Sequence, residues 1–229
     1  MAVLLKNLLL RAPKMEDLVA ITELVAACDF AEYGFTDSTM EDLASNWQRS
    51  DFNLATDAWV IVTNRGQLVG FVCVWHRDHE QISTYVGVHP EYRGRGIGTL
   101  LLRLVEERAR QFVRKARPGT RVTLSSSVSS VNEQAKRLFE REGYIQIRKF
   151  WRISVGSGES SGKPSRRGNF EIDLDVDSQQ LIGATQLYDR DAVYIIREYS
   201  IYEKELRAGA SVQQGVNIND ELKVLTVVG

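Results

Sequence analysis

The stretch Val86-Gly-Val-His-Pro-Glu-Tyr-Arg-Gly-Arg-Gly-Ile-Gly98 carries the clearest structural pattern in this chain. An apolar run ends at Val88, Pro90 breaks it, and glycines follow at positions 94, 96 and 98. Residues 97–105 then place apolar side chains at the i, i+3, i+4, i+7, i+8 spacing of a helix with one buried face. The pattern predicts a strand, a glycine loop and the N-terminus of a helix, in that order.

A loop of this kind can bind an anion. Glycines let the backbone come close to a ligand, and the first N–H groups of a helix are unpaired donors at the positive end of its dipole. Phosphate is the usual ligand at such a place, and Arg93 and Arg95 add positive charge beside it. A tight turn that binds nothing is the alternative interpretation.

Two common phosphate loops do not fit this spacing. A P-loop would place a lysine directly before the threonine, whereas Gly98 precedes Thr99 here. A dinucleotide fingerprint would need an acidic residue about 20 residues further on, at the end of a second parallel strand. Position 118 is Pro118, and the next strand is predicted to begin only near Val122.

The composition is that of an ordinary globular protein of 229 residues, 43% apolar and 26% charged. A net charge of −1 gives no electrostatic footprint for nucleic acid or an anionic membrane. No apolar run reaches membrane-spanning length, and Lys6 and Asn7 interrupt the apolar opening segment, which we interpret as a first strand. Cys28 and Cys73 are expected to be buried free thiols of a cytoplasmic protein.

Apolar periodicity and turn residues predict the remaining elements. A first helix is predicted to begin at Pro13, and a second follows the cap residues 37–39. Residues 31–36 between them are predicted to be irregular. Within that segment Tyr33, Gly34 and Phe35 either face a substrate or pack in a loop. The further expected elements are strands at 58–63, 68–75 and 81–88, a helix to about residue 116, a strand at 122–127, a helix from 132, and closing strands at 145–155. His76 and His79 fall in a turn with no further ligands near them in sequence, so no metal site is predicted.

A second segment matches a known signature. Residues 132–144 read Asn-Glu-Gln-Ala-Lys-Arg-Leu-Phe-Glu-Arg-Glu-Gly-Tyr, which resembles the pattern Asn-x-x-Ala-x-x-Leu-Tyr-x-x-x-Gly-Phe/Tyr of the GNAT acetyltransferases. The segment from Arg93 to Gly98 resembles the acyl-CoA signature of the same family, Arg/Gln-x-x-Gly-x-Gly/Ala. The two signatures stand in the right order about 35 residues apart, and the resemblance covers roughly residues 8–155.

The resemblance implies a mixed α/β fold, with a central, mostly antiparallel sheet whose middle strands splay and which helices flank. It implies transfer of an acetyl group from acetyl-CoA, as co-substrate, to an amine of a small molecule or peptide. The residues expected to hold acetyl-CoA are Val86, Gly87, Val88, Arg93, Gly94, Arg95, Gly96, Ile97, Gly98, Thr99 and Asn132.

The catalytic groups are less defined. Glu80, at the start of the strand that enters the site, is the first candidate for the general base, with a solvated turn carboxylate as the alternative. The family's frequent tyrosine, which protonates the departing thiolate, is Phe139 here, and a phenyl ring has no proton to donate. Tyr85 and Tyr144 are therefore the candidate acids. Phe139 and the lack of an acidic residue at positions 84–85 leave a second hypothesis open, a CoA-binding regulatory or degenerate module without activity.

The C-terminal part repeats the second signature at an offset of 49 residues. The run from Ala135 to Arg148 matches the run from Ala184 to Arg197, without a glycine loop of its own. We therefore predict a GNAT domain at residues 1–176, with a flexible loop at 156–168, and a partial second repeat, a helix with strands and a tail, at 177–229. The repeat is expected to dock at a sheet edge, in the same chain or swapped across a homodimer.

Overall fold

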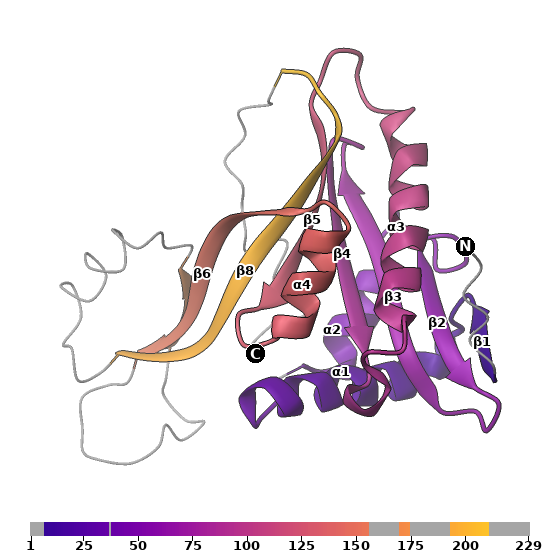
Figure 1. Ribbon diagram of the computed structural model, residues 1–229, viewed down its shortest axis with the longest axis vertical. Coiled ribbons are helices and arrows are strands. Elements are labelled where there is room, and N and C mark those ends of the chain that lie inside the picture. Colours follow the sequence, from indigo (N-terminus) through magenta and orange to yellow (C-terminus); the bar gives the residue numbers. More distant parts are fainter. Residues whose placement is uncertain (1–6, 37, 156–169, 175–192, 211–229) are drawn as a thin grey trace.

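The computed structural model describes residues 7–36, 38–155, 170–174 and 193–210, and these form a mixed sheet with helices on both faces (Figure 1). Within this part of the chain the sheet has eight strands in the order β1-β2-β3-β4-β5-β8-β6-β7. All neighbours are antiparallel except β4 and β5, which are parallel. The strands are β1 (Leu8–Arg11), β2 (Ala58–Thr63), β3 (Leu68–Arg77), β4 (Gln81–Val88), β5 (Val122–Ser129), β6 (Ile145–Val155), β7 (Phe170–Leu174) and β8 (Val193–Arg207).

The helices lie close to the predicted positions. They are α1 (Leu18–Tyr33), α2 (Met40–Trp47), α3 (Ile97–Val113) and α4 (Glu133–Arg141), with short 3-10 turns η1 (Met15–Asp17) and η2 (Pro90–Tyr92). Thr39 caps α2 as predicted, because its hydroxyl accepts the Asp42 N–H. Helix α1 continues through Tyr33, although the sequence predicts irregular chain from residue 31. No helix of the described residues is long and apolar enough to cross a membrane.

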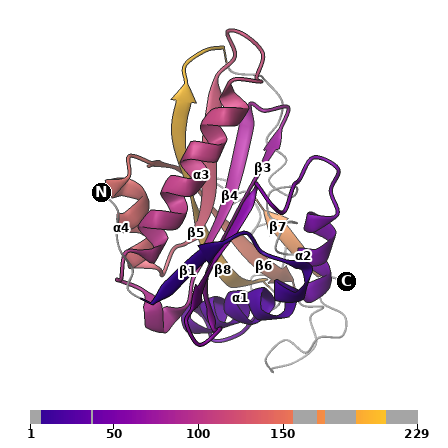
Figure 2. The ribbon, with the colours of Figure 1, turned by 90° about the vertical axis from the view of Figure 1, so that its right-hand side faces the viewer.

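Two apolar cores lie on opposite faces of the sheet. Strand β2 shows the alternation: Val60 packs with α1 and α2, and Ile61 packs with α3. Figure 2 shows α3 in front of the sheet and α1 behind it. Leu101 and Val105 of α3 are fully buried, as is Ile21 of α1. Each such side chain stabilises the fold by about 1.5–3 kcal/mol, so the apolar stripes read from the sequence hold these helices on the sheet.

The two parallel strands separate at their C-terminal ends. Strand β4 pairs with β5 only at residues 81–83, opposite 123–125. The Ser126 hydroxyl donates to the Thr84 carbonyl at 3.0 Å just beyond the last ladder pair. From there the ladder ends, while β4 stays paired with β3 through Val88. The predicted splay of the middle strands is therefore present, and it opens a gap between residues 85–88 and 127–129.

Strand β8, drawn in yellow in Figure 1, lies inside the sheet. It pairs with β5 on one side and with β6 on the other, and Tyr202 is 1% exposed. The predicted docking of this segment beside the closing strand β6 is confirmed within the same chain, but the predicted position at a sheet edge is wrong, because both edges of β8 are hydrogen-bonded. The boundary expected after residue 176 thus falls within a single sheet. The repeat stays a prediction, since its helical half and the loop at 156–168 lie outside the described residues.

Candidate active site

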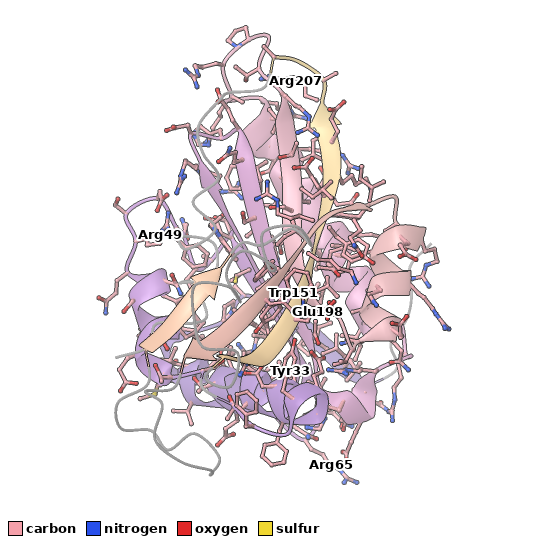
Figure 3. All side chains as sticks on the ribbon, turned by 90° about the vertical axis from the view of Figure 1, so that its left-hand side faces the viewer. Tyr33, Arg49, Arg65, Trp151, Glu198 and Arg207 are labelled. Atoms are coloured by element: carbon pink, nitrogen blue, oxygen red, sulfur yellow. The ribbon has the colours of Figure 1, made fainter. Side chains whose placement is uncertain are left out.

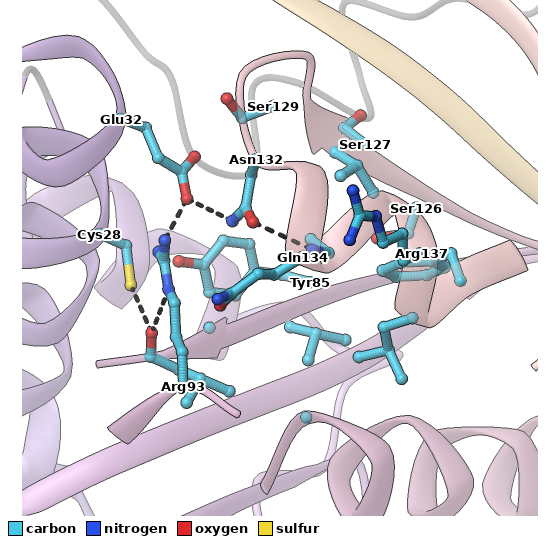
Figure 4. Close-up of a pocket in the computed structure, with 18 of the residues that line it drawn as sticks. Cys28, Glu32, Tyr85, Arg93, Ser126, Ser127, Ser129, Asn132, Gln134 and Arg137 are labelled. Atoms are coloured by element: carbon cyan, nitrogen blue, oxygen red, sulfur yellow. Dashed lines mark hydrogen bonds and ion pairs between the residues drawn. The ribbon is translucent and has the colours of Figure 1, made fainter. Parts of the chain in front are cut away.

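A cavity of about 530 Å³ lies at the gap between β4 and β5. Its walls come from the C-terminal half of α1, the end of β4, the glycine loop, the end of β5, helix α4 and Tyr199 of β8 (Figure 4). These segments are far apart in the sequence, and the splayed sheet brings them together.

The glycine loop forms one mouth of this cavity. Gly96 precedes α3 with a φ of 84°, a left-handed conformation that side chains disfavour, and no side chain caps the helix. The first N–H groups of α3 are therefore not taken by a cap. Gly94, with a φ of 76°, has no atom within 4 Å of the place where a Cβ would stand. The backbone here leaves room for an anion and supplies donors for it.

Arg93 joins the loop to α1. Its Nε donates to the Val88 carbonyl at 3.3 Å, and its terminal nitrogen lies 2.8 Å from Glu32 Oε1. Both side chains are largely shielded, at 20% and 13% exposure. The arginine of the signature is thus held in an ion pair, and its charge is balanced before any phosphate arrives.

Asn132 links the same carboxylate to α4. Its Oδ1 accepts the Ala135 N–H at 3.0 Å, which caps α4, and its Nδ2 donates to Glu32 Oε1 at 2.6 Å. Helices α3 and α4 pack closely beside Asn132, because a Cβ on Gly98 of α3 would stand only 2.9 Å from Leu138 of α4. Figure 4 shows Glu32 between Arg93 and Asn132, so a single carboxylate braces the loop, α1 and α4.

The comparisons with known proteins agree with this geometry. Residues 55–146, which contain β4, the loop, α3, β5 and α4, match the acetyltransferase (GNAT) domain family. This part of the chain is similar to the GNAT acetyltransferase domains. Among solved structures, a GCN5-related N-acetyltransferase from Sphaerobacter thermophilus is similar over 90% of this chain and 98% of its own, with a TM-score of 0.77 and 19% identity.

Two further structures share the GNAT fold. A putative acetyltransferase from Salmonella typhimurium, solved with its cofactor acetyl-CoA, covers 90% of this chain and 97% of its own, with a TM-score of 0.55 and 15% identity. A spermidine N-acetyltransferase from Vibrio cholerae, in complex with CoA and spermine, covers 87% and 95%, with a TM-score of 0.51 and 14% identity. At these identities the likeness concerns the fold.

Most of the residues expected to hold acetyl-CoA line this cavity. They are Val86, Gly87, Val88, Arg93, Gly94, Gly96, Gly98, Thr99 and Asn132. Ile97 does not line it, because its side chain is buried against the sheet beneath α3. The guanidinium of Arg95 lies over the Tyr92 ring at 4.7 Å and donates to the Glu91 carbonyl, beside the mouth.

The structure does not bring Glu80 to the cavity. This residue lies at the opposite end of β4, where Arg117 donates to both of its carboxylate oxygens at 2.6 and 2.9 Å. The hydrogen bonds from Arg117 hold the pKa of Glu80 below its usual range although burial opposes this. Both oxygens are occupied at a distance from the gap, so Glu80 is a structural ion pair and we do not retain it as the base.

Of the two candidate acids, one lines the cavity and the other does not. Tyr85 lines the cavity, and burial raises its pKa well above the ordinary value. Tyr144 does not line it and is 2% exposed, because it packs edge-on against Phe139 in the core. Phe139 itself lines the cavity and also packs against Tyr202. Only Tyr85 of the two predicted acids is therefore in a position to meet a ligand in this cavity.

Helix α1 supplies cavity residues that the sequence analysis missed, except for Tyr33. Cys28 and Asp29 lie one helical turn before Glu32, and all three line the cavity. Their spacing, together with Tyr33, was the signal that the sequence offered: polar and aromatic side chains gather in the last two turns of α1. Burial raises the pKa of the Cys28 thiol to about 11.

A buried arginine of β8 supports this end of α1. Arg197, 4% exposed, lies 3.4 Å from Asp29 Oδ2 and over the rings of Tyr33 and Phe35 at 4.8 and 4.9 Å. Figure 3 shows Tyr33 near Glu198 of β8, whose main-chain carbonyl accepts from the Tyr33 hydroxyl at 3.5 Å. The central position of β8 therefore fixes the inner wall of the cavity.

Proposed function

We propose that this protein is an N-acetyltransferase that transfers an acetyl group from acetyl-CoA to an amine. The observation that carries this proposal is the continuous cavity from the uncapped N-terminus of α3 to the gap between β4 and β5. The phosphate site at one end of the cavity fits the anionic head of a ligand, and the opened sheet at the other end fits an extended amide arm joined to that head. The match to the acetyltransferase (GNAT) domain supports acetyl-CoA as that molecule.

The residues present fit acetyl-CoA. Backbone N–H groups between Gly94 and Thr99 would hold the pyrophosphate, because the helix dipole and the missing side chains favour an anion there. The amide arm would pair with backbone at Val86 and Val88 like an added strand. Ion pairing with Glu32 leaves Arg93 to position the loop instead of contacting the phosphate directly.

The arrangement supports catalysis mainly by positioning. An amine that is held beside the thioester at the gap reacts faster, because the two reactants are already aligned. Tyr85 supplies the hydroxyl that Phe139 lacks, and its raised pKa keeps its proton in place for the departing thiolate at neutral pH. Two free cysteines, Cys28 and Cys73, suit a reducing cytoplasm, which is where we place the reaction.

The test compares two glycine variants with matched backbone strain. Gly94 and Gly119 have φ angles of 76° and 78°, and both have open space where a Cβ would stand, but only Gly94 lines the cavity. Gly94→Glu places a carboxylate in the phosphate site and should abolish acetyl-CoA binding in calorimetry, whereas Gly119→Glu should bind like the wild type. Equal affinities in the two variants would contradict the loop assignment.

Turnover separates an enzyme from a binding module. Release of free CoA from acetyl-CoA is followed with a thiol reagent, with a panel of primary amines as acceptors. Amine-dependent release by the wild type, lost in Gly94→Glu and kept in Gly119→Glu, is the expected result. Tight acetyl-CoA binding without release for any amine would favour the regulatory module instead.

A further inference from the structure

We propose that Glu32 is the general base of this site and that its free carboxylate oxygen receives the acceptor as an ammonium ion. The assignment rests on the proposed acetyl transfer and replaces the candidate Glu80, which the fold places elsewhere. No sequence motif marks Glu32, because α1 is remote in the chain from both signatures.

The two oxygens of Glu32 have different surroundings. Oε1 accepts from Arg93 at 2.8 Å and from Asn132 at 2.6 Å. Oε2 accepts no hydrogen bond from the described residues, and Figure 4 shows it turned away from both partners. One oxygen therefore holds the side chain in place while the other is left to meet a ligand, the arrangement that a positioned base requires.

The carboxylate also has the right location. Arg93 is anchored on the β4 side of the gap through the Val88 carbonyl, and Asn132 stands on the β5 side at the start of α4. Glu32 bridges the two, so it lies over the gap through which the arm of acetyl-CoA would run. The side chain is 13% exposed and lines the cavity, so it is shielded but reachable.

The other titratable groups of α1 in the cavity are less suited to accept a proton. Asp29 Oδ2 is surrounded by Arg197 at 3.4 Å, the Thr36 hydroxyl at 3.2 Å and the Ser38 hydroxyl at 3.1 Å. The Cys28 thiol has a pKa of about 11 and donates to the Val88 carbonyl. No histidine lines the cavity among the described residues. Glu32 is thus the carboxylate with an oxygen to spare.

The acceptor binds as R–NH₃⁺ against Oε2 and gives one proton to it, which exposes the nitrogen lone pair. The nitrogen attacks the thioester carbon, the C–N bond forms and the C–S bond breaks. The thiolate leaves with the bonding electrons and takes the second proton lost by the nitrogen, relayed through the Tyr85 hydroxyl. Glu32 then releases its proton to solvent, and the products are the amide, the thiol CoA and one proton.

The decisive variant is Glu32→Gln, because glutamine keeps an oxygen for Arg93 and Asn132 but cannot take up a proton. With an amine found in the panel, kcat at pH 7 should fall by on the order of 10²–10⁴ while acetyl-CoA affinity stays unchanged. The deficit should shrink by about tenfold per pH unit toward the amine pKa near ~10, since the amine then deprotonates without help. Glu80→Gln is the matched control, a buried glutamate outside the cavity, and should keep wild-type kcat and pH profile.

A binding measurement decides the case without turnover. Butylammonium, benzylammonium and spermidine are titrated calorimetrically into protein saturated with CoA. At least one should bind, and Glu32→Gln should weaken it by about tenfold or more, because a charge-assisted hydrogen bond is lost. Glu80→Gln should leave this affinity unchanged.

The outcomes separate this assignment from the proposed function. CoA binding without turnover, but with alkylammonium affinity that depends on Glu32, would contradict acetyl transfer and retain Glu32 as the amine-binding carboxylate. The assignment itself is overturned in three cases: if no alkylammonium binds, if Glu32→Gln retains wild-type kcat, pH profile and amine affinity, or if the variant loses acetyl-CoA affinity in proportion to activity. The last result would show that Glu32 is only a brace.

Discussion

Gly70 of β3 controls how closely α3 and its glycine loop approach the sheet. A Cβ at this position would stand 3.0 Å from Ile97 Cγ2, 3.3 Å from Ile61 Cβ and 3.3 Å from Leu101 Cδ1. Comfortable carbon contacts begin near ~3.5 Å, so the nearest contact is too short by about 0.5 Å. Ile97 is the first residue of α3, and Ile61 Cβ is fixed to the backbone of β2. Gly70→Ala should therefore push the N-terminus of α3 away from β3.

Two effects of Gly70→Ala oppose each other. Removing a glycine from a strand interior would by itself stabilise the fold by roughly 0.5–1 kcal/mol, whereas overpacking costs about 1–3 kcal/mol. Because three contacts are short at once, overpacking should win with a net loss of about 1–2 kcal/mol. For a chain of this size that lowers the thermal midpoint by roughly 2–8 °C, and the displaced loop should also bind acetyl-CoA more weakly.

Calorimetric melting and acetyl-CoA titration of Gly70→Ala measure both consequences. Ile97→Leu removes the Cγ2 methyl that lies closest, so the double variant Gly70→Ala with Ile97→Leu should lose less than the sum of the two single changes. A higher melting point for Gly70→Ala with unchanged acetyl-CoA affinity would refute the argument, since it would mean that the helix has room to spare.

Three further predictions concern the ion pair, the thiols and the cap. Glu80→Gln should lower the melting point at pH 7, and the difference from the wild type should shrink as the pH falls below ~4.3, because a carboxylate whose folded pKa is lowered stabilises the fold above its unfolded pKa and loses that contribution as the pH falls through the folded pKa. Thermal scans across this range check it. Saturating acetyl-CoA, which has no free thiol, should slow reaction of Cys28 with a thiol reagent, because Cys28 lines the cavity, and leave the slow labelling of Cys73 unchanged, as peptide mass spectrometry would report. Asn132→Ala should cost about 1 kcal/mol in urea unfolding through loss of the α4 cap.

Helices, strands and turns that are encoded by residues close together in the chain could be predicted from the sequence. The strands at residues 58–63, 81–88 and 145–155 have the predicted bounds, since alternation and turn residues mark their ends. The glycine loop and α3 follow from glycine spacing and an apolar stripe. The cap at Thr39 follows from its own side chain. Each of these depends on residues within a few positions of one another.

Site residues from outside the signatures were mostly missed or misplaced. Glu80 has the residue type of a base and the right strand, but an arginine 37 positions away occupies it. Glu32 carries no local mark, and its role as a brace depends on Arg93, 61 positions on, and Asn132, 100 positions on. Partnerships over such distances arise from chain topology, which periodicity and propensity do not contain.

The sequence by itself predicted the glycine loop and the order of strands and helices, because each depends on the spacing of residues that are close together in the chain. Only the tertiary structure decided that β8 inserts between β5 and β6, that β4 and β5 part after Ser83, and that α1 supplies the acidic wall of the cavity. These features come from the packing of segments across the whole sheet, and hydrogen bonding between remote strands selects one arrangement from many that the same local patterns permit.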